Sequence, residues 1–283
     1  MNYFLTGGTG FIGRFLVEKL LARGGTVHVL VREQSQDKLD KLRERWGADE
    51  TQVKAVIGDL TSKNLGIDAK TMKALKGKID HFFHLAAVYD MGADEEAQQA
   101  TNIEGTRAAV NAAEAMGAKH FHHVSSIAAA GLFKGIFRED MFEEAEKLDH
   151  PYLRTKHESE KVVREECKVP FRIYRPGMVI GHTATGEMDK VDGPYYFFKM
   201  IQKIRHALPQ WVPTIGVEGG RLNIVPVDFV VNAMDHIAHL EGEDGKCFHL
   251  VDTDPYKVGE ILNIFSEAGH APRMGMRIDS RMF

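Results

Sequence analysis

A tyrosine and a lysine stand four residues apart in a stretch with helical character that begins at Pro151. Because residues at i and i+4 share one face of a helix, the phenol of Tyr152 and the ammonium of Lys156 can lie side by side. A fixed positive charge and the positive end of the helix both stabilise a phenolate, and so lower the tyrosine pKa from about 10 towards neutral pH. Tyr152 is therefore a candidate proton donor.

Two serines give this pair a context that its spacing alone does not provide. The same spacing recurs at Tyr195 and Lys199, within an aromatic run and without a matching serine. Ser125 and Ser126, in contrast, end a strand-like segment, and Tyr152 follows 26 residues after Ser126 at the start of the next helix. The carboxyl ends of parallel strands form the ligand-binding edge of α/β proteins. We predict that one of the two serines meets Tyr152 there, and that Tyr195 is a packing residue.

Glycines follow the first short apolar segment at once. Residues 6–13 read Thr-Gly-Gly-Thr-Gly-Phe-Ile-Gly and fit two spacings, GxGxxG and GxxGxxG. A turn from strand to helix that binds a pyrophosphate needs positive φ, close backbone approach and close helix packing, all of which favour glycine. The N–H groups at the start of the helix bind the phosphates. The residues predicted to bind a dinucleotide here are Gly7, Thr9, Gly10, Phe11, Ile12 and Gly13.

The residue at the end of the second strand indicates which dinucleotide is bound. An acid is usual there when the ribose carries a free 2′-hydroxyl. This sequence has Arg32, 19 residues after Gly13, and a guanidinium can hold a 2′-phosphate through two hydrogen bonds. The alternative is a solvated arginine paired with Glu33. NADPH is therefore the favoured cofactor, with Asp59 and Leu60, after the third strand, next to its adenine ring.

Alternating strand and helix patterns must position these residues. They predict an α/β fold, a Rossmann-type doubly wound parallel sheet with right-handed crossovers and helices on both faces. The expected domains are a dinucleotide-binding domain, residues 1–181 with returning segments near 221–252, and a smaller substrate lobe, residues 182–220 and 253–283. The expected strands are 3–6, 26–31, 53–57, 79–85, 120–124, 171–174 and 248–251, and the expected helices are 11–21, 37–46, 101–115, 151–167, 225–238 and 258–268.

Composition excludes several classes of protein. The 283 residues are 43% hydrophobic and 27% charged, enough for a sizeable core, and the net charge of −4 gives no electrostatic footprint for nucleic acid. Two cysteines, Cys167 and Cys247, are too few for a disulfide scaffold or a zinc module and fit a reducing cytoplasm. No apolar run reaches the roughly 18 residues of a membrane span, and the start is unlike a signal peptide. On a strand His120 and His122 face away from His123, so no metal site is predicted.

Taken together, these motifs resemble the extended short-chain dehydrogenase/reductase family. The segments that carry the resemblance are the glycine turn, Asp59-Leu60, His84 to Ala87, Ser125-Ser126, Tyr152 with Lys156, and residues 175–181 (Arg-Pro-Gly-Met-Val-Ile-Gly). The resemblance implies an oxidoreductase in which Ser126, or else Ser125, orients a substrate carbonyl and Tyr152 protonates its oxygen. It also implies that Lys156 holds the nicotinamide ribose and that Asn102 supports the lysine through water. The residues implied to line the nicotinamide are Ala86, Ala87, Pro176 and Val179.

Within that family the chain is most similar to the reductase domains of bacterial fatty acyl-CoA and thioester reductases. Arg32, the Val-Ser-Ser strand end and residues 222–232 carry this similarity. The aromatic run 195–201 suits an acyl chain, and equally suits packing within the lobe. The expected function is NADPH-dependent reduction of a fatty acyl-CoA or long-chain aldehyde. The alternatives are a nucleotide-sugar epimerase or dehydratase, and a non-catalytic redox sensor or scaffold.

The expected partner is a small acyl or carbonyl substrate. The family resemblance leaves a homodimer open. Extended members of the family usually run longer, so we expect a second domain or a C-terminal cap to be missing after Phe283.

Overall fold

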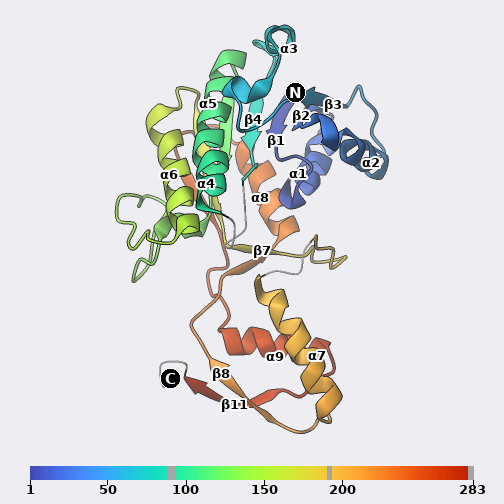
Figure 1. The fold of residues 1–283 in the computed structure, drawn as a ribbon, viewed down its shortest axis with the longest axis vertical. Coiled ribbons are helices and arrows are strands. Elements are labelled where there is room, and N and C mark those ends of the chain that lie inside the picture. Colours follow the sequence, from blue (N-terminus) through green and yellow to red (C-terminus); the bar gives the residue numbers. More distant parts are fainter. Residues whose placement is uncertain (88–93, 190–192, 280–283) are drawn as a thin grey trace. The chain divides into compact units, whose positions relative to one another are not determined.

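A seven-stranded parallel sheet forms the first part of the molecule (Figure 1). The computed structural model describes residues 1–87, 94–189 and 193–279. The sheet order is β10-β6-β5-β4-β1-β2-β3, and every pairing is parallel. The order reverses between β1 and β4, which is where doubly wound sheets bind ligands. The strands are β1 (Asn2–Thr6), β2 (Thr26–Val31), β3 (Val53–Ile57), β4 (His81–His84), β5 (His120–Val124), β6 (Phe171–Pro176) and β10 (Cys247–Leu250).

Helices cover both faces of this sheet. On one face α1 packs against α8, and on the other α5 packs against α3 and α6 (Figure 1). The helices are α1 (Phe11–Ala22), α2 (Gln36–Trp46), α3 (Ala69–Leu75), α4 (Glu95–Gln98), α5 (Gly105–Met116), α6 (Pro151–Glu166) and α8 (Val227–Ala238). Shorter turns are η1 (Glu33–Ser35), η2 (Lys63–Gly66), η3 (Gln99–Glu104) and η4 (Ile127–Ala130).

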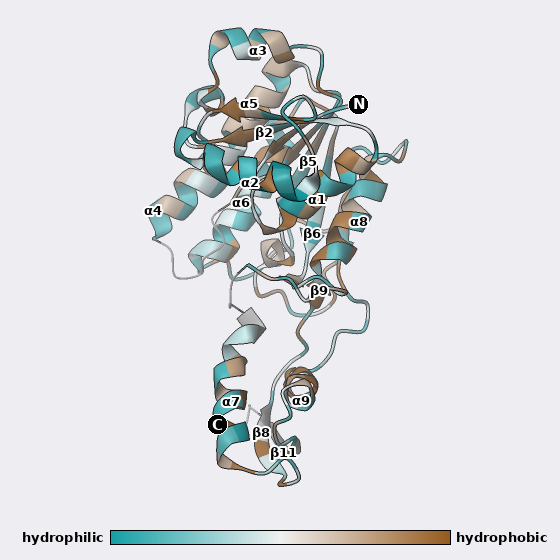
Figure 2. Ribbon diagram, turned by 90° about the vertical axis from the view of Figure 1, so that its right-hand side faces the viewer, coloured by the Kyte–Doolittle hydropathy of each residue, from teal (hydrophilic) through white to brown (hydrophobic). Residues whose placement is uncertain are grey.

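Burial on both faces explains why the central strands β1 and β2 consist mostly of hydrophobic residues. In Figure 2, β2 has the colour of hydrophobic residues, whereas the solvent-facing helix α2 is largely hydrophilic. Phe4, Phe82 and Phe121 lie side by side on neighbouring strands and pack with the buried face of α5. This core fixes the ends of β1, β4 and β5 relative to one another.

The fold class predicted from the sequence is confirmed, and most element bounds agree within a few residues. The expected helix 101–115 differs, because residues Gln99–Glu104 form a π-helical turn and the regular helix begins at Gly105. Hydrophobic periodicity does not reveal such a turn, since it shifts the register by only one residue. None of the helices in the described part of the chain is both long enough and apolar enough to cross a bilayer.

The chain forms two compact units. The first comprises Met1–Pro176 and Val227–Leu250, and the second comprises Gly177–Pro226 and Val251–Phe283. The sequence-based division assigned residues 177–181 and 221–226 to the first domain. In the structure these segments pair as strands β7 (Met178–Ile180) and β9 (Ile224–Pro226), which belong to the second unit. The other elements of that unit are η5 (Gly193–Tyr196), α7 (Phe197–Ala207), β8 (Thr214–Glu218), α9 (Val258–Ala268) and β11 (Met274–Asp279).

Candidate active site

The glycine turn joins β1 to α1 in a conformation that side chains would prevent. Gly7 has φ +73°, and a Cβ atom placed on it would lie 2.7 Å from the backbone nitrogen of Ala86. A Cβ atom on Gly13 would lie 2.1 Å from the carbonyl oxygen of Gly7. Gly10 is the N-cap of α1 and has no side chain that could accept a hydrogen bond from the first N–H groups of the helix. The turn therefore presents backbone N–H groups at a helix start, as a dinucleotide pyrophosphate requires.

The residues around this helix start are accessible to a ligand. Thr9, Gly10, Phe11 and Ile12 are all half-buried, although they adjoin the fully buried end of β1. The turn thus fits the dinucleotide that its sequence predicts.

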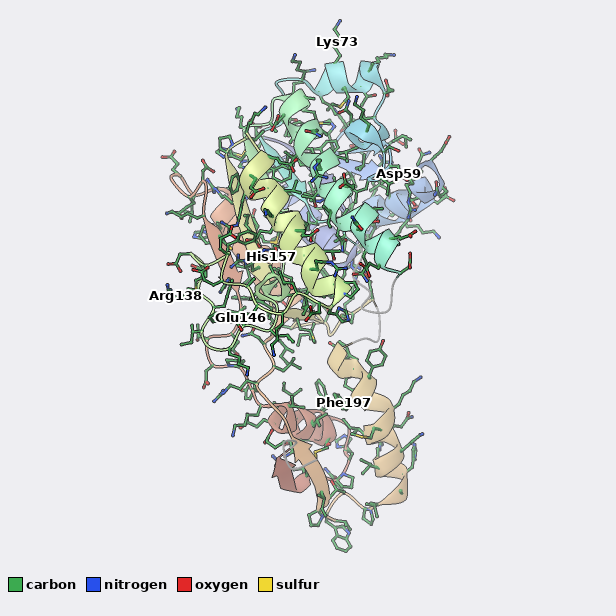
Figure 3. All side chains as sticks on the ribbon, turned by 60° about the vertical axis from the view of Figure 1, so that its left-hand side comes forward. Asp59, Lys73, Arg138, Glu146, His157 and Phe197 are labelled. Atoms are coloured by element: carbon green, nitrogen blue, oxygen red, sulfur yellow. The ribbon has the colours of Figure 1, made fainter. Side chains whose placement is uncertain are left out.

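Side chains at the ends of β2 and β3 adjoin the same edge of the sheet. Arg32 follows β2 and is exposed. Hydrogen bonds from Thr61, and to a lesser degree the charge of Arg32, hold the pKa of Asp59 (Figure 3) below its usual range. Leu60 packs closely on the first residue of α5, since a Cβ atom on Gly105 would lie 2.8 Å from its Cγ.

The site residues predicted from the sequence do not include a second arginine beside the glycine turn. Arg14 directly follows the last glycine of the motif, and its guanidinium lies 5.3 Å and 5.1 Å from the ring centres of Phe11 and Phe15. Arg45 lies 5.5 Å from the ring centre of Phe15. Arg14 stands one residue after Gly13, in the first turn of the helix, and this position is the signal that could have identified it.

The tyrosine and lysine of α6 lie on the buried face of its first two turns. His150 caps this helix, its Nδ1 accepting a hydrogen bond of 3.2 Å from the N–H of Tyr152, and Pro151 is the first helical residue. Tyr152 and Lys156 are each only 6% exposed. Burial lowers the pKa of Lys156 to about 8, while the negative charge of Glu160 acts in the opposite direction. The pKa of Lys156 therefore lies well below that of an exposed lysine, which is above 10.

The two serines at the end of β5 face different partners. Ser125 is buried, and its hydroxyl donates a 2.8 Å hydrogen bond to Glu160. Ser126 is half-buried, and its Oγ accepts a hydrogen bond of 3.1 Å from the N–H of Ala128 as the cap of η4. His157 (Figure 3) bonds the carbonyl oxygen of Ala129 at 2.9 Å and so ties this turn to α6. Ser126 is thus the serine whose hydroxyl is closer to solvent.

Asn102 is buried in the π-helical turn that precedes α5. Its Nδ2 donates a 3.2 Å hydrogen bond to Oγ1 of Thr155, the neighbour of Lys156. Its backbone carbonyl accepts a hydrogen bond from Thr106, whose hydroxyl also bonds His84. The structure thus brings Asn102 to the helix that carries the tyrosine and lysine.

The end of β4 is fixed next to the glycine turn. The hydroxyl of Thr6 bonds Nδ1 of His84 at 2.7 Å and accepts a 3.3 Å hydrogen bond from the N–H of Ala86. Ala86 and Ala87 are half-buried. Pro176 ends β6 in the first unit, whereas Val179 lies on β7 in the second.

The histidines of β5 lie on opposite faces of the sheet, as their alternation predicts. The rings of His120 and His122 stack on His81, and the ring of His123 stacks on His84. Burial, and then the charge of Lys156, lower the pKa of His123 to about 3. In the part of the chain that the structure describes, no three histidine, cysteine or acidic side chains group as metal ligands would.

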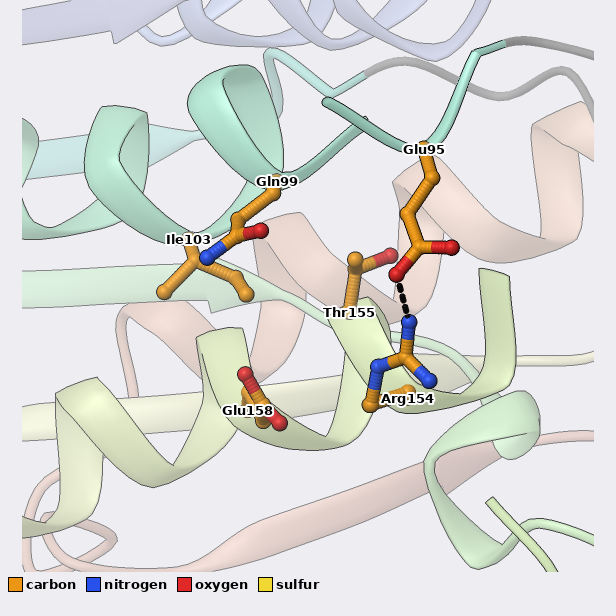
Figure 4. A pocket seen from close by; sticks show the side chains of 6 residues that line it. All are labelled: Glu95, Gln99, Ile103, Arg154, Thr155 and Glu158. Atoms are coloured by element: carbon orange, nitrogen blue, oxygen red, sulfur yellow. Dashed lines mark hydrogen bonds and ion pairs between the residues drawn. The ribbon is translucent and has the colours of Figure 1, made fainter. Parts of the chain in front are cut away.

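A small pocket of about 200 Å³ lies between the turn α4–η3 and α6 (Figure 4). The ion pair between Arg154 and Glu95 spans it. This ion pair joins α6 to α4 on the outside, while the Asn102–Thr155 hydrogen bond joins η3 to α6 on the inside. The residues that line the pocket are Glu95, Gln99, Ile103, Arg154, Thr155 and Glu158.

A family model described as male sterility protein, an NAD-binding family, matches residues 5–234. The chain belongs to this family. The male sterility family consists of reductase domains of the extended short-chain dehydrogenase/reductase type, so the family predicted from the sequence is confirmed. Membership makes the chain an oxidoreductase domain that uses a nicotinamide cofactor.

Two curated relatives are much longer than this chain. The non-canonical nonribosomal peptide synthetase FrzA of a Cladobotryum species is 30% identical over 271 residues, which are 88% of this chain and 26% of the relative. The aldehyde reductase lnbA of Aspergillus flavus is 30% identical over 269 residues, with the same two shares. The chain thus spans about a quarter of the length of either protein.

Solved structures show the same architecture. The terminal R domain from the myxalamid PKS-NRPS biosynthetic pathway has a TM-score of 0.82 at 27% identity, over 96% of this chain and 72% of that one. A UDP-glucuronic acid 4-epimerase from Bacillus cereus has a TM-score of 0.73 at 18% identity, over 99% and 87% of the two chains. The second likeness concerns the fold alone.

Proposed function

We propose that the chain is an NADPH-dependent reductase domain that reduces an acyl thioester or an aldehyde. The observation that carries this proposal is the buried pair of Tyr152 and Lys156 at the start of α6, on the helix that Asn102 and Ser125 contact. A glycine turn suited to a dinucleotide ends β1 in the same unit. Membership of a reductase family supports the same reaction type.

Each side chain has a role in this reaction. NADPH, when bound, supplies the hydride that reduces the carbonyl carbon. Ser126 donates a hydrogen bond that orients the carbonyl oxygen, and Tyr152 gives that oxygen its proton. Lys156 binds the nicotinamide ribose, and its positive charge stabilises the phenolate that Tyr152 becomes when it has given up its proton. Asn102 positions the lysine through water. With a thioester, expulsion of the thiol then yields the aldehyde.

The preference for NADPH rests on cationic side chains. Arg32 stands where an acid would bind a 2′-hydroxyl, and Arg14 lies beside the glycine turn as a second guanidinium. Guanidinium groups bind phosphate by paired hydrogen bonds.

The proposed substrate carries a fatty acyl chain. The second unit exposes a group of large apolar side chains on and near α7, among them Tyr196 at 69% and Trp211 at 82% exposed. Burying an acyl chain against such side chains gains about 0.8 kcal/mol for each methylene. The names of FrzA, lnbA and the myxalamid R domain support a thioester or aldehyde as the reacting group, because they describe a peptide synthetase, an aldehyde reductase and a terminal domain of a synthetase pathway.

The test is NADPH consumption with a fatty acyl-CoA, a long-chain aldehyde and a short ketone. Replacing Tyr152 by Phe removes the proton donor and should lower kcat by about 10²–10⁴-fold. Undiminished activity of Tyr152→Phe would exclude the mechanism. Tightly held cofactor that is never consumed, with turnover of a nucleotide sugar, would instead identify an epimerase.

A further inference from the structure

A carboxylate lies fully buried in the first unit, on the helix that carries Tyr152 and Lys156. Glu160 follows Lys156 by four residues and therefore shares its helix face. An ionised carboxylate is costly to bury unless charged or hydrogen-bonding groups surround it. The partners of Glu160 therefore indicate what the residue does.

Three side chains donate hydrogen bonds to this carboxylate. Arg175 donates through Nη2 to Oε1 at 2.6 Å and through Nε to Oε2 at 2.9 Å. Ser125 donates to Oε2 at 2.8 Å, and Arg164 donates to Oε1 at 2.9 Å. Burial alone would raise the pKa of Glu160, but the hydrogen bonds and charge of Arg175 lower it below its usual range. Glu160 is thus ionised at neutral pH.

The partners of Glu160 adjoin the residues to which the proposed function assigns roles. Ser125 directly precedes Ser126 at the end of β5, and Arg175 directly precedes Pro176 at the end of β6. Arg175 also donates two hydrogen bonds of 3.1 Å to the carbonyl oxygen of Met141, which fixes its guanidinium. One carboxylate therefore joins two strand ends to α6.

Titratable groups from three elements surround Lys156. On α6 itself the charge of Glu160 acts on it and Tyr152 shares its helix face, and His84 on β4 and His123 on β5 interact with it. Burial lowers the pKa of both histidines far below neutral, so both rings are uncharged at pH 7. The negative charge of Glu160 is what acts against the burial of the ammonium.

We propose that Glu160 is a positioning residue of the active site, whose ionised carboxylate holds the ends of β5 and β6 against α6 and keeps Lys156 protonated. Its effect on catalysis rests on the proposed function, whereas its effect on the charge of Lys156 does not. Glu160 contacts neither substrate nor cofactor in this role, and acts through Ser125, Arg175 and Lys156.

The test follows the protonation of Lys156 directly, by NMR of the 13Cε signals of labelled lysine during a pH titration. Lys156→Met assigns the signal, because that signal disappears. In Glu160→Gln the midpoint should fall about one pH unit below that of the wild type, since an uncharged amide no longer favours the ammonium. Glu165→Gln removes an exposed carboxylate from the same helix and should leave the midpoint unchanged. An unchanged midpoint in folded Glu160→Gln would overturn the proposal.

Glu160→Asp separates charge from geometry, and decides the matter where the amide variant does not fold. The shorter carboxylate keeps the charge but cannot reach both strand ends, so Lys156 should titrate near the wild-type pH. We expect kcat to fall about tenfold while the KM for NADPH changes less than about twofold. Wild-type kcat in folded Glu160→Asp would overturn the positioning role.

The pH profile links the two measurements. The basic limb of kcat should move to lower pH in Glu160→Gln by the same interval as the NMR midpoint. Inactivity of the wild type and of Glu165→Gln alike would count against the proposed function, and the NMR titration would then decide the role of Glu160 by itself.

Discussion

Two regions of the molecule contain a tyrosine and a lysine at the same spacing, but the burial and the contacts of the two pairs differ. In the first unit Tyr152 and Lys156 are buried, and burial brings the pKa of the lysine to about 8. In the second unit Lys199 is exposed, and the ring of Tyr195 packs against those of Phe198 and Phe265. The hydroxyl of Tyr195 accepts a 3.0 Å hydrogen bond from the N–H of Gly181. Spacing alone does not create a reactive pair, because reactivity needs a buried ammonium beside a phenol.

Acid should affect the first unit most strongly. His28, His81 and His123 are buried there, and burial lowers their pKa values to about 4, 3 and 3. They stay neutral in the fold but take up protons in the unfolded chain below about pH 6.5. The contribution of these histidines to stability is therefore constant above about pH 6.5. It falls by up to about 1.4 kcal/mol per pH unit for each histidine as the pH drops towards 4.

Thermal unfolding between pH 7.5 and pH 4.5 measures this loss. Neither ring nitrogen of His123 has a hydrogen-bond partner among the described residues, so His123→Leu removes a titrating group without breaking a hydrogen bond. The variant should lose stability less steeply with acid than the wild type does. The exposed His206, replaced by Gln, is the matched control. If stability fell equally steeply with acid in all three proteins, protonation of His123 would not contribute to the loss.

The two lysines provide the next largest contrast. Lys156→Met should lower kcat about 10²–10³-fold, because the phenol of Tyr152 loses its neighbouring cation and the cofactor ribose loses a donor. Lys199→Met should leave kcat within about twofold, since Lys199 is exposed and lies in the other unit. NADPH consumption under identical conditions measures both. Comparable losses in the two variants would remove the distinction between the pairs.

Arg32 gives the smallest expected effect, and it concerns the choice of cofactor. Arg32→Ala should raise the KM for NADPH about tenfold and leave the KM for NADH nearly unchanged, because only NADPH carries the 2′-phosphate. Glu33→Gln, which changes the neighbouring exposed residue, is the control. An equal rise in the KM for both cofactors would mean that Arg32 does not bind the 2′-phosphate.

Local patterns were sufficient to predict much of the fold. The β-branched run Thr26–Val31 and the strand Val53–Ile57 were predicted with the bounds that the structure has, and so was the helix Val258–Ala268. The turn at Gly7–Gly13 was predictable because its glycines are needed wherever a strand turns closely into a helix. These features depend on neighbours in the chain.

Long-range contacts decided the rest. In the sequence Glu160 is one of several acids on a charged helix. Only its hydrogen bonds with Ser125, 35 residues away, and Arg175, 15 residues away, reveal that its carboxylate is buried and paired. The unit boundary likewise depends on the pairing of β7 with β9, some 46 residues apart. The sequence by itself determined which groups could react. The tertiary structure alone decided which of them are buried and charged together, because burial and electric fields arise from residues that are distant in the chain.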